Sequence, residues 1–125
     1  MTDDLTLLGR ATNGPVDHVE TFPAPRGCDR VVFTTDEVTS LCPVTGQPDI
    51  SSIRLDYVPD ERCIESKSLK LFLWGFRNRS VFAEQLAVDI ADEVWETVAP
   101  LSVDVVVTQH ARGGIVTETH SSRRR

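Results

Sequence analysis

Hydrophobic positions recur along the chain with two different spacings, and the change of spacing marks where strands give way to helices. Apolar residues that alternate with polar ones, enriched in valine, isoleucine and aromatic side chains, predict half-buried strands. Apolar residues that recur every three or four positions predict amphipathic helices. The elements predicted in this way are strands over residues 30–35, 53–57, 103–107 and 115–119, and helices over residues 66–76 and 82–98.

The order of these elements, ββααββ, predicts an α+β domain in which an antiparallel sheet carries two helices on one face. Residues 1–29, rich in Pro, Gly and Asp, are expected to form an extended N-terminal arm, and residues 30–120 to form the domain. Residues 121–125 (SSRRR) are expected to be a disordered basic tail. Residues 39–49 are predicted to be a loop, because two prolines and a glycine interrupt the strand pattern.

Composition narrows the classes of function. With a net charge of −6, the chain lacks the excess of Lys and Arg that a general nucleic-acid binder needs. No apolar run is long enough to cross a bilayer and the acidic start is unlike a secretory signal, so a cytoplasmic protein is expected. Three cysteines without CxxC spacing and three scattered histidines predict neither a disulfide framework nor a metal site.

The loop over residues 39–49 holds the first candidate for chemistry. Cys42 lies within it, and a cysteine attacks carbon only as the thiolate, whose pKa is about 8.5 in a free cysteine. Asp49 stands at the end of the same loop, whose prolines and glycine can hold an acid at a fixed distance from the sulfur. An inert cysteine and a turn aspartate explain the same residues, so this pattern alone leaves both interpretations open.

A second candidate is the segment ESKSLKLF, residues 65–72. Ser66 at the start of a predicted helix is typical of an N-cap, with the following lysines in solvent. Lysines near a helix N-terminus oppose the helix dipole, however, and basic side chains beside helix-start amides suit a phosphate group. The two interpretations have equal weight on physical grounds.

Together, SLCPVTGQPD (residues 40–49) and ESKSLKLF (residues 65–72) resemble the paired signature of 7-cyano-7-deazaguanine reductases, enzymes of the queuosine pathway. The similarity extends from LTLLG (residues 5–9) to RGGI (residues 112–115), so it covers nearly the whole chain. The resemblance implies a tunnelling fold (T-fold). It also implies a homo-oligomer of pentameric rings that stack as a decamer, with active sites between subunits.

The family's chemistry implies a role for each matching residue. Cys42 would add to the nitrile carbon of a small deazapurine and form a covalent thioimide, and Asp49 would protonate the nitrogen. NADPH would deliver one hydride to the thioimide and a second to the resulting imine. The substrate-binding positions are matched by Ile64, Glu65, Ser66 and Glu84, and the cofactor positions by Ser66, Lys67, Arg112 and Gly113.

One position departs from the family pattern, which usually has a histidine immediately before the glutamate. Here Ala83 precedes Glu84, and if that histidine orients the base or relays a proton, the exchange lowers activity or alters the substrate. Two other functions stay open. Related amidinotransferases keep the cysteine and the aspartate but act without NADPH on a nitrile inside transfer RNA, and a purine- or pterin-binding T-fold protein would bind without turnover. The complete NADPH signature favours the reductase.

Overall fold

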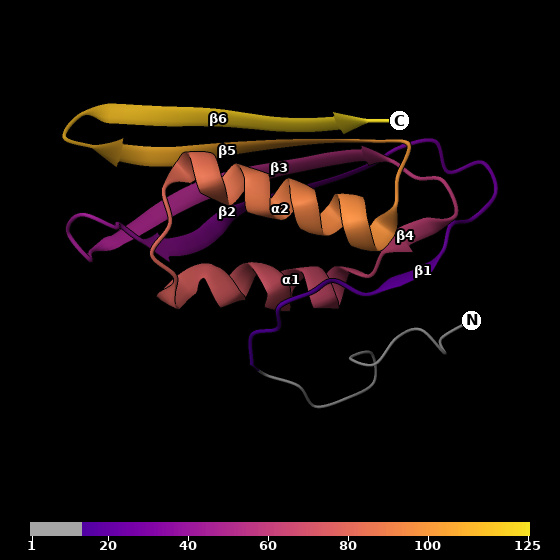
Figure 1. Ribbon diagram of the computed structural model, residues 1–125, viewed down its shortest axis with the longest axis horizontal. Coiled ribbons are helices and arrows are strands. Elements are labelled where there is room, and N and C mark those ends of the chain that lie inside the picture. Colours follow the sequence, from indigo (N-terminus) through magenta and orange to yellow (C-terminus); the bar gives the residue numbers. More distant parts are fainter. Residues whose placement is uncertain (1–13) are drawn as a thin grey trace.

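The computed structural model describes residues 14–125 and shows a four-stranded antiparallel sheet that carries two helices on one face (Figure 1). The sheet strands, in the spatial order β2-β3-β5-β6, are β2 (Val31–Leu41), β3 (Pro48–Val58), β5 (Ser102–Arg112) and β6 (Ile115–Arg124). The helices are α1 (Ser66–Trp74), the short 3-10 helix η1 (Gly75–Asn78) and α2 (Ala83–Val98). The predicted α+β class is confirmed.

A second, two-stranded sheet was not predicted. It pairs β1 (Thr21–Pro23) with β4 (Arg62–Ile64), so part of the expected arm lies against the segment that leads into α1. Val19, which also precedes residue 30, is buried in the main core. Strands of three residues carry too little alternation to be recognised in a sequence. Residues 1–13, including the LTLLG segment of the resemblance, lie outside the described residues.

The core lies between α2 and the sheet. Leu86, Ile90 and Val94 recur at four-residue spacing on the buried side of the helix, as the periodicity predicts. Alternate residues of β5, from Val103 to Val107, meet them from the sheet. Each fully buried aliphatic side chain stabilises the fold by about 1.5–3 kcal/mol. This packing fixes α2 over the sheet and thereby places the first turn of the helix.

The loop predicted over residues 39–49 is shorter in the structure, and the prediction that Asp49 lies in a loop is wrong. Strand β2 continues to Leu41 and β3 begins at Pro48, so that only residues 42–47 form the turn. Proline is tolerated there because the first residue of a strand need not donate a backbone hydrogen bond. As a consequence, strand alternation places the Asp49 side chain on the helix-covered face, where it is buried.

The prediction of a disordered tail over residues 121–125 is also wrong. Strand β6 extends to Arg124, which donates to Asp104 on β5 at 2.8 Å. Arg123 donates to Asp92 on α2 at 2.7 Å, and the guanidinium of Arg125 lies 3.9 Å from the Trp95 ring centroid. The run of arginines therefore has partners on two other elements, which order it as the last part of the sheet.

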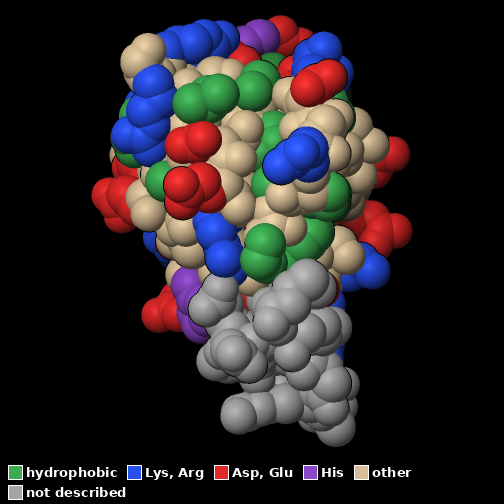
Figure 2. Space-filling model, turned by 90° about the vertical axis from the view of Figure 1, so that its right-hand side faces the viewer, with side chains coloured by type: hydrophobic (Ala, Val, Ile, Leu, Met, Phe, Trp, Pro, Cys, Tyr) green, Lys and Arg blue, Asp and Glu red, His purple; other side chains and the backbone are tan. Residues whose placement is uncertain are grey.

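Charges of both signs cover the end of the molecule that lies on the right of Figure 1. In Figure 2, the described residues of this face show Lys and Arg side chains interspersed with Asp, Glu and hydrophobic side chains, without a continuous basic surface. Within residues 14–125, neither helix is both long and apolar enough to cross a bilayer. The expected lack of a nucleic-acid partner stays a prediction.

Candidate active site

A cavity of about 360 Å³ lies where the turn between β2 and β3, the end of β5 and the start of α2 meet. This volume falls within the range of small-molecule sites. Its lining includes four predicted site residues, namely Cys42, Asp49, Glu84 and Arg112. The other lining residues are Thr45, Phe82, Ala83, Gln109 and Thr117. No three His, Cys, Asp or Glu side chains within residues 14–125 gather as a metal site would require.

The turn that follows β2 prepares Cys42 for attack. The Cys42 N–H donates to the Gln47 carbonyl at 2.8 Å, and the Gly46 N–H donates back to the Cys42 carbonyl at 2.8 Å. Gly46 takes a φ of 71°, which glycine adopts without strain. Hydrogen bonds lower the pKa of the Cys42 thiol, first from the Thr45 hydroxyl and then from the backbone amides of Thr45 and Val44. Burial and the Asp49 charge oppose this effect but are smaller. This turn therefore favours the thiolate.

Replacing Thr45 by valine is expected to slow alkylation of Cys42 at neutral pH. The hydroxyl hydrogen bond is the largest cause of the lowered pKa of Cys42. Its loss raises that pKa, so a smaller fraction of thiolate is present at any pH below the new value. The measurement is the rate of iodoacetamide alkylation against pH, whose midpoint should move upward. Thr45→Ser keeps a hydroxyl and should follow the parent, and equal midpoints for all three proteins would contradict this account of the turn.

Asp49 is held by an arginine. Its side chain is only 6% exposed, and its Oδ1 accepts from the Arg112 Nη1 at 2.7 Å. The same guanidinium donates to the Pro48 carbonyl at 2.9 Å and to the Gln47 Oε1 at 3.0 Å. Arg112 was predicted to contact the cofactor, and in the structure its guanidinium pairs with the candidate acid. The residue after it, Gly113, forms the β5–β6 turn with a φ of 59°.

Glu84 stands in the first turn of α2, where a carboxylate is favourable to the helix dipole. It is exposed at the cavity, and its side chain has no hydrogen-bond or ion-pair partner among residues 14–125. Both oxygens are therefore available to accept hydrogen bonds from a ligand. The preceding Ala83 is buried, and its carbonyl accepts from the Thr119 hydroxyl at 3.1 Å.

The remaining predicted site residues, Ile64 to Lys67, lie at the far end of α1. The end of β2 is fixed beside the segment after η1, because the Leu41 N–H donates to the Arg79 carbonyl at 2.9 Å. Glu65, by contrast, stands at the N-terminal end of α1, whose nine residues span about 14 Å. One chain therefore does not bring the segment over residues 64–67 to Cys42.

Glu65, and not Ser66, caps α1. Its Oε2 accepts from the Lys67 N–H and its Oε1 from the Ser68 N–H, both at 2.8 Å. These first amides of the helix are occupied, so the expectation that they bind a phosphate is not supported. Side chains of Ser66 and Lys67 stay at this end as possible ligands. Ile64 is a core residue whose N–H donates to the Tyr57 hydroxyl at 2.8 Å.

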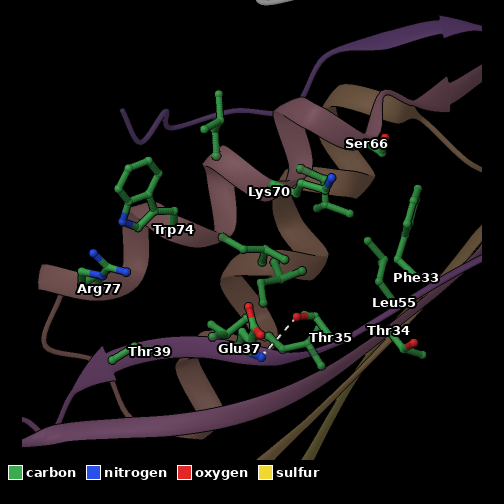
Figure 3. Close-up of a pocket in the computed structure, with 16 residues that line it drawn as sticks. Phe33, Thr34, Thr35, Glu37, Thr39, Leu55, Ser66, Lys70, Trp74 and Arg77 are labelled. Atoms are coloured by element: carbon green, nitrogen blue, oxygen red, sulfur yellow. Dashed lines mark hydrogen bonds between the residues drawn. The ribbon is translucent and has the colours of Figure 1, made fainter. Parts of the chain in front are cut away.

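A larger cavity of about 480 Å³ lies between α1 and β2 (Figure 3). In Figure 3, Lys70 and Trp74 of α1 lie on the opposite side from Thr34 and Thr35 of β2, with Ser66 at one end. The lining is mostly apolar and includes none of the residues that surround Cys42. The candidate reaction site is therefore the smaller cavity, since it holds the nucleophile, the acid and a carboxylate that has no partner among the described residues.

Sequence reasoning missed four residues of the smaller cavity, namely Thr45, Phe82, Gln109 and Thr117. Gln109 and Thr117 reach it only through the register of β5 with β6, in which they pair directly, and that register leaves no local signal in the sequence. Thr45 lies within the SLCPVTGQPD segment, three positions after Cys42. A hydroxyl at that spacing in a tight turn was a usable signal, because Thr hydroxyls commonly hydrogen-bond to nearby turn groups.

Comparison with known proteins places the chain among similar sequences. The family model described as "QueF-like protein" matches residues 48–125. A protein of Anaeromyxobacter sp. (strain Fw109-5), named NADPH-dependent 7-cyano-7-deazaguanine reductase, is 45% identical over 87% of this chain and 93% of its own length. A protein of the same name from Chelativorans sp. (strain BNC1) is 46% identical over 92% of this chain and 81% of its own length.

A solved structure shares the fold. The crystal structure of an archaeosine synthase, QueF-Like, in the apo form superposes with a TM-score of 0.72, covering 79% of this chain and 94% of that one. Its sequence is 25% identical, well below the values for the two proteins named as reductases.

Proposed function

The chain belongs to the family of NADPH-dependent 7-cyano-7-deazaguanine reductases, and from this premise we propose that it reduces the nitrile of 7-cyano-7-deazaguanine to an aminomethyl group, a step of queuosine biosynthesis. The fold is the tunnelling fold of this family. The observation that carries the proposal is the meeting of Cys42, Asp49 and Glu84 at one cavity. We place the reaction in the cytoplasm.

Cys42 starts the reaction. The sulfur forms a bond to the nitrile carbon, one of the C≡N π bonds breaks, and the nitrogen takes up a proton. The thiol and the nitrile together contain every atom of the thioimide, so this addition needs no oxidant or reductant. Asp49 is the candidate for carrying the proton, because it is the buried carboxylic acid that lines the same cavity as the sulfur.

NADPH is the cofactor of this reaction, and each of two molecules that bind in turn would supply one of the two hydrides that convert the nitrile to the amine. The donor set at the start of α1 suits it: the hydroxyl of Ser66 and the ammonium groups of Lys67 and Lys70 are ligands for phosphate. Because Glu65 occupies the first helix amides, these side chains would hold the phosphates. Arg112 and Gly113 are the proposed contacts on the cavity side.

Glu84 is the proposed anchor of the deazapurine. A carboxylate accepts two hydrogen bonds from the N–H edge of a guanine-like ring, and Glu84 has both oxygens available among the described residues. Ile64, Glu65 and Ser66 are proposed to contact the substrate from the other half of the site. The methyl group of Ala83 leaves the cavity wall without the imidazole that the family usually has there, so the base is oriented by Glu84 without that ring.

We further propose that two subunits build each site, within a homo-oligomer of stacked pentamers. The proposed site has two halves: the cavity half, which contains Cys42, and the α1 half, which is the segment over residues 64–67. These halves lie at opposite ends of α1, so only a second copy can bring residues 64–67 to Cys42 without unfolding the helix. Large apolar side chains are exposed at the cavity end, as a subunit interface requires. They include Val44 (80% exposed), Phe82 (53%) and Ile115 (70%).

Two inactive variants should restore each other. Cys42→Ala damages the cavity half, and Lys67→Glu damages the α1 half without weakening the helix, because a carboxylate near the N-terminus suits the dipole. In oligomers reassembled from equal amounts, about a quarter of the interfaces combine two intact halves. The mixture should therefore regain about a quarter of the parent turnover, measured as NADPH oxidation.

The matched control mixes Cys42→Ala with Asp49→Asn, which damage the same half. This mixture should stay inactive, since every interface then lacks one cavity residue. If the Cys42→Ala and Lys67→Glu mixture also stayed inactive while forming oligomers of the parent size, the site would not lie between subunits.

The stoichiometry of NADPH separates the functions. The reductase consumes about two NADPH per nitrile, since each hydride carries two electrons. An amidinotransferase would give an ammonia-dependent product without NADPH oxidation, and a binding protein would bind without turnover. The experiment follows nicotinamide absorbance with 7-cyano-7-deazaguanine as substrate. Product without loss of reduced nicotinamide would reject the reductase proposal.

A further inference from the structure

Arg112 lies at the end of β5, and its side chain reaches the turn between β2 and β3. Its three acceptors, Asp49 Oδ1, the Pro48 carbonyl and Gln47 Oε1, all come from consecutive residues of that turn and the start of β3. The side chain of Arg112 is 39% exposed, whereas that of Asp49 is 6% exposed. The arginine therefore fixes a buried carboxylate from the solvent side of the cavity.

This arrangement fixes the orientation of the Asp49 carboxyl group. A guanidinium is planar and always charged, so it holds a carboxylate in one orientation more strictly than an ammonium group does. Among the described residues that line the cavity, Arg112 is the only cation. The other ionisable groups there are the Cys42 thiol on the turn and Glu84 on α2. Asp49 thus lines the same cavity as the reacting sulfur, with its carboxyl group held by Arg112.

We propose that Arg112 is a positioning residue for the addition step and acts through Asp49. This inference rests on the proposed function. The carboxylate that Arg112 holds accepts the proton of the Cys42 thiol while the S–C bond forms, and then passes that proton to the nitrile nitrogen. The proton count balances without a co-reactant. The addition therefore depends on Arg112 before NADPH takes part, which a role in cofactor binding alone does not require.

The test measures thioimide formation on Cys42 with the nitrile alone and no NADPH, by rapid quenching and intact-protein mass spectrometry. Arg112→Gln should slow adduct formation about tenfold, and Arg112→Lys, which keeps the charge but not the planar fork, should recover part of that loss. In an Asp49→Asn background, Arg112→Gln should change the rate by less than about twofold, since the group it acts through is gone.

Arg124→Gln is the matched control. It breaks another arginine–aspartate pair of the β5–β6 hairpin, the 2.8 Å contact with Asp104, far from the cavity, and should form the adduct at the parent rate. The inference is overturned if Arg112→Gln forms the adduct as fast as the parent and only the KM for NADPH rises. It is also overturned if Arg112→Gln slows adduct formation by the same factor in the parent and in the Asp49→Asn background.

The adduct measurement has two further outcomes, one for the parent and one for the Arg112→Gln variant. If the parent forms no adduct, the proposed function fails, and the inference fails with it. If circular dichroism shows that Arg112→Gln does not fold, Arg112→Lys takes its place in the test. Adduct formation by Arg112→Lys at the parent rate would overturn the inference. Slower adduct formation would support it, provided that Arg112→Lys has no further effect on the rate in the Asp49→Asn background.

Discussion

Replacing Cys42 by alanine is expected to abolish nitrile reduction, with turnover reduced at least about 10⁴-fold. A nitrile is a poor hydride acceptor, and the sulfur converts it into a C=N group that a proton can activate. Alanine leaves the turn intact, because the hydrogen bonds that close it at residue 42 use backbone atoms. Binding of the deazaguanine should persist, since Glu84 is unchanged. The measurements are single-turnover NADPH oxidation and equilibrium binding of the substrate.

Cys28→Ala is the control for this substitution. Cys28, like Cys42, is a free and partly exposed cysteine, but it lies before β2 and does not line the cavity. Its replacement should leave turnover at the parent value. Turnover by Cys42→Ala within tenfold of the parent would show that hydride reaches the nitrile without a covalent intermediate.

Replacing Asp49 by asparagine should reduce turnover about 100-fold, the usual effect of losing a positioned acid–base group. Asparagine keeps the size of the side chain and an acceptor for Arg112, but it can neither take up nor release a proton at the nitrile nitrogen. The loss should appear in the rate of thioimide formation and not in substrate affinity. Rapid-quench measurement of the adduct separates these two quantities.

Asp56→Asn is the matched control on the same strand. Asp56 also pairs with arginines, Arg30 and Arg54, and these lower the pKa of its carboxyl, yet it lies on the face of β3 opposite to Asp49. It should lower stability slightly and leave the adduct rate unchanged. If both variants formed the adduct at the parent rate, the proton would come from another donor.

The longer elements were predictable because their signals are local. Leu86, Ile90 and Val94 recur at every fourth position of one helix, and the alternation from Val103 to Val107 marks β5. The C-terminal tail is a contrary case, because its order depends on distant partners. The arginines of the tail resembled a solvated end, although Asp92 and Asp104 lie 31 and 20 positions away in the sequence.

In the candidate site, too, features with a local sequence signal were predictable and contacts between distant residues were not. The SLCPVTGQPD segment identified Cys42 and Asp49, and strand pairing then brings them together, with Ser40 opposite Asp49 in the register. The contact between Arg112 and Asp49 joins residues 63 positions apart, and the sequence around either residue contains no signal that predicts it. Glu65 was predicted to bind the ligand, and the structure adds a role that the sequence analysis did not foresee, because its carboxylate caps α1 by accepting from two helix amides.

The central claim is that the Cys42 sulfur bonds to the nitrile carbon, and the most direct test is the mass of the protein after mixing with 7-cyano-7-deazaguanine in the absence of NADPH. The account predicts a gain equal to the whole mass of the nitrile, located on the peptide that contains Cys42 and removed when NADPH is added. An unchanged mass in a protein that still binds the compound, or an adduct on Cys28 or Cys63 instead, would contradict it.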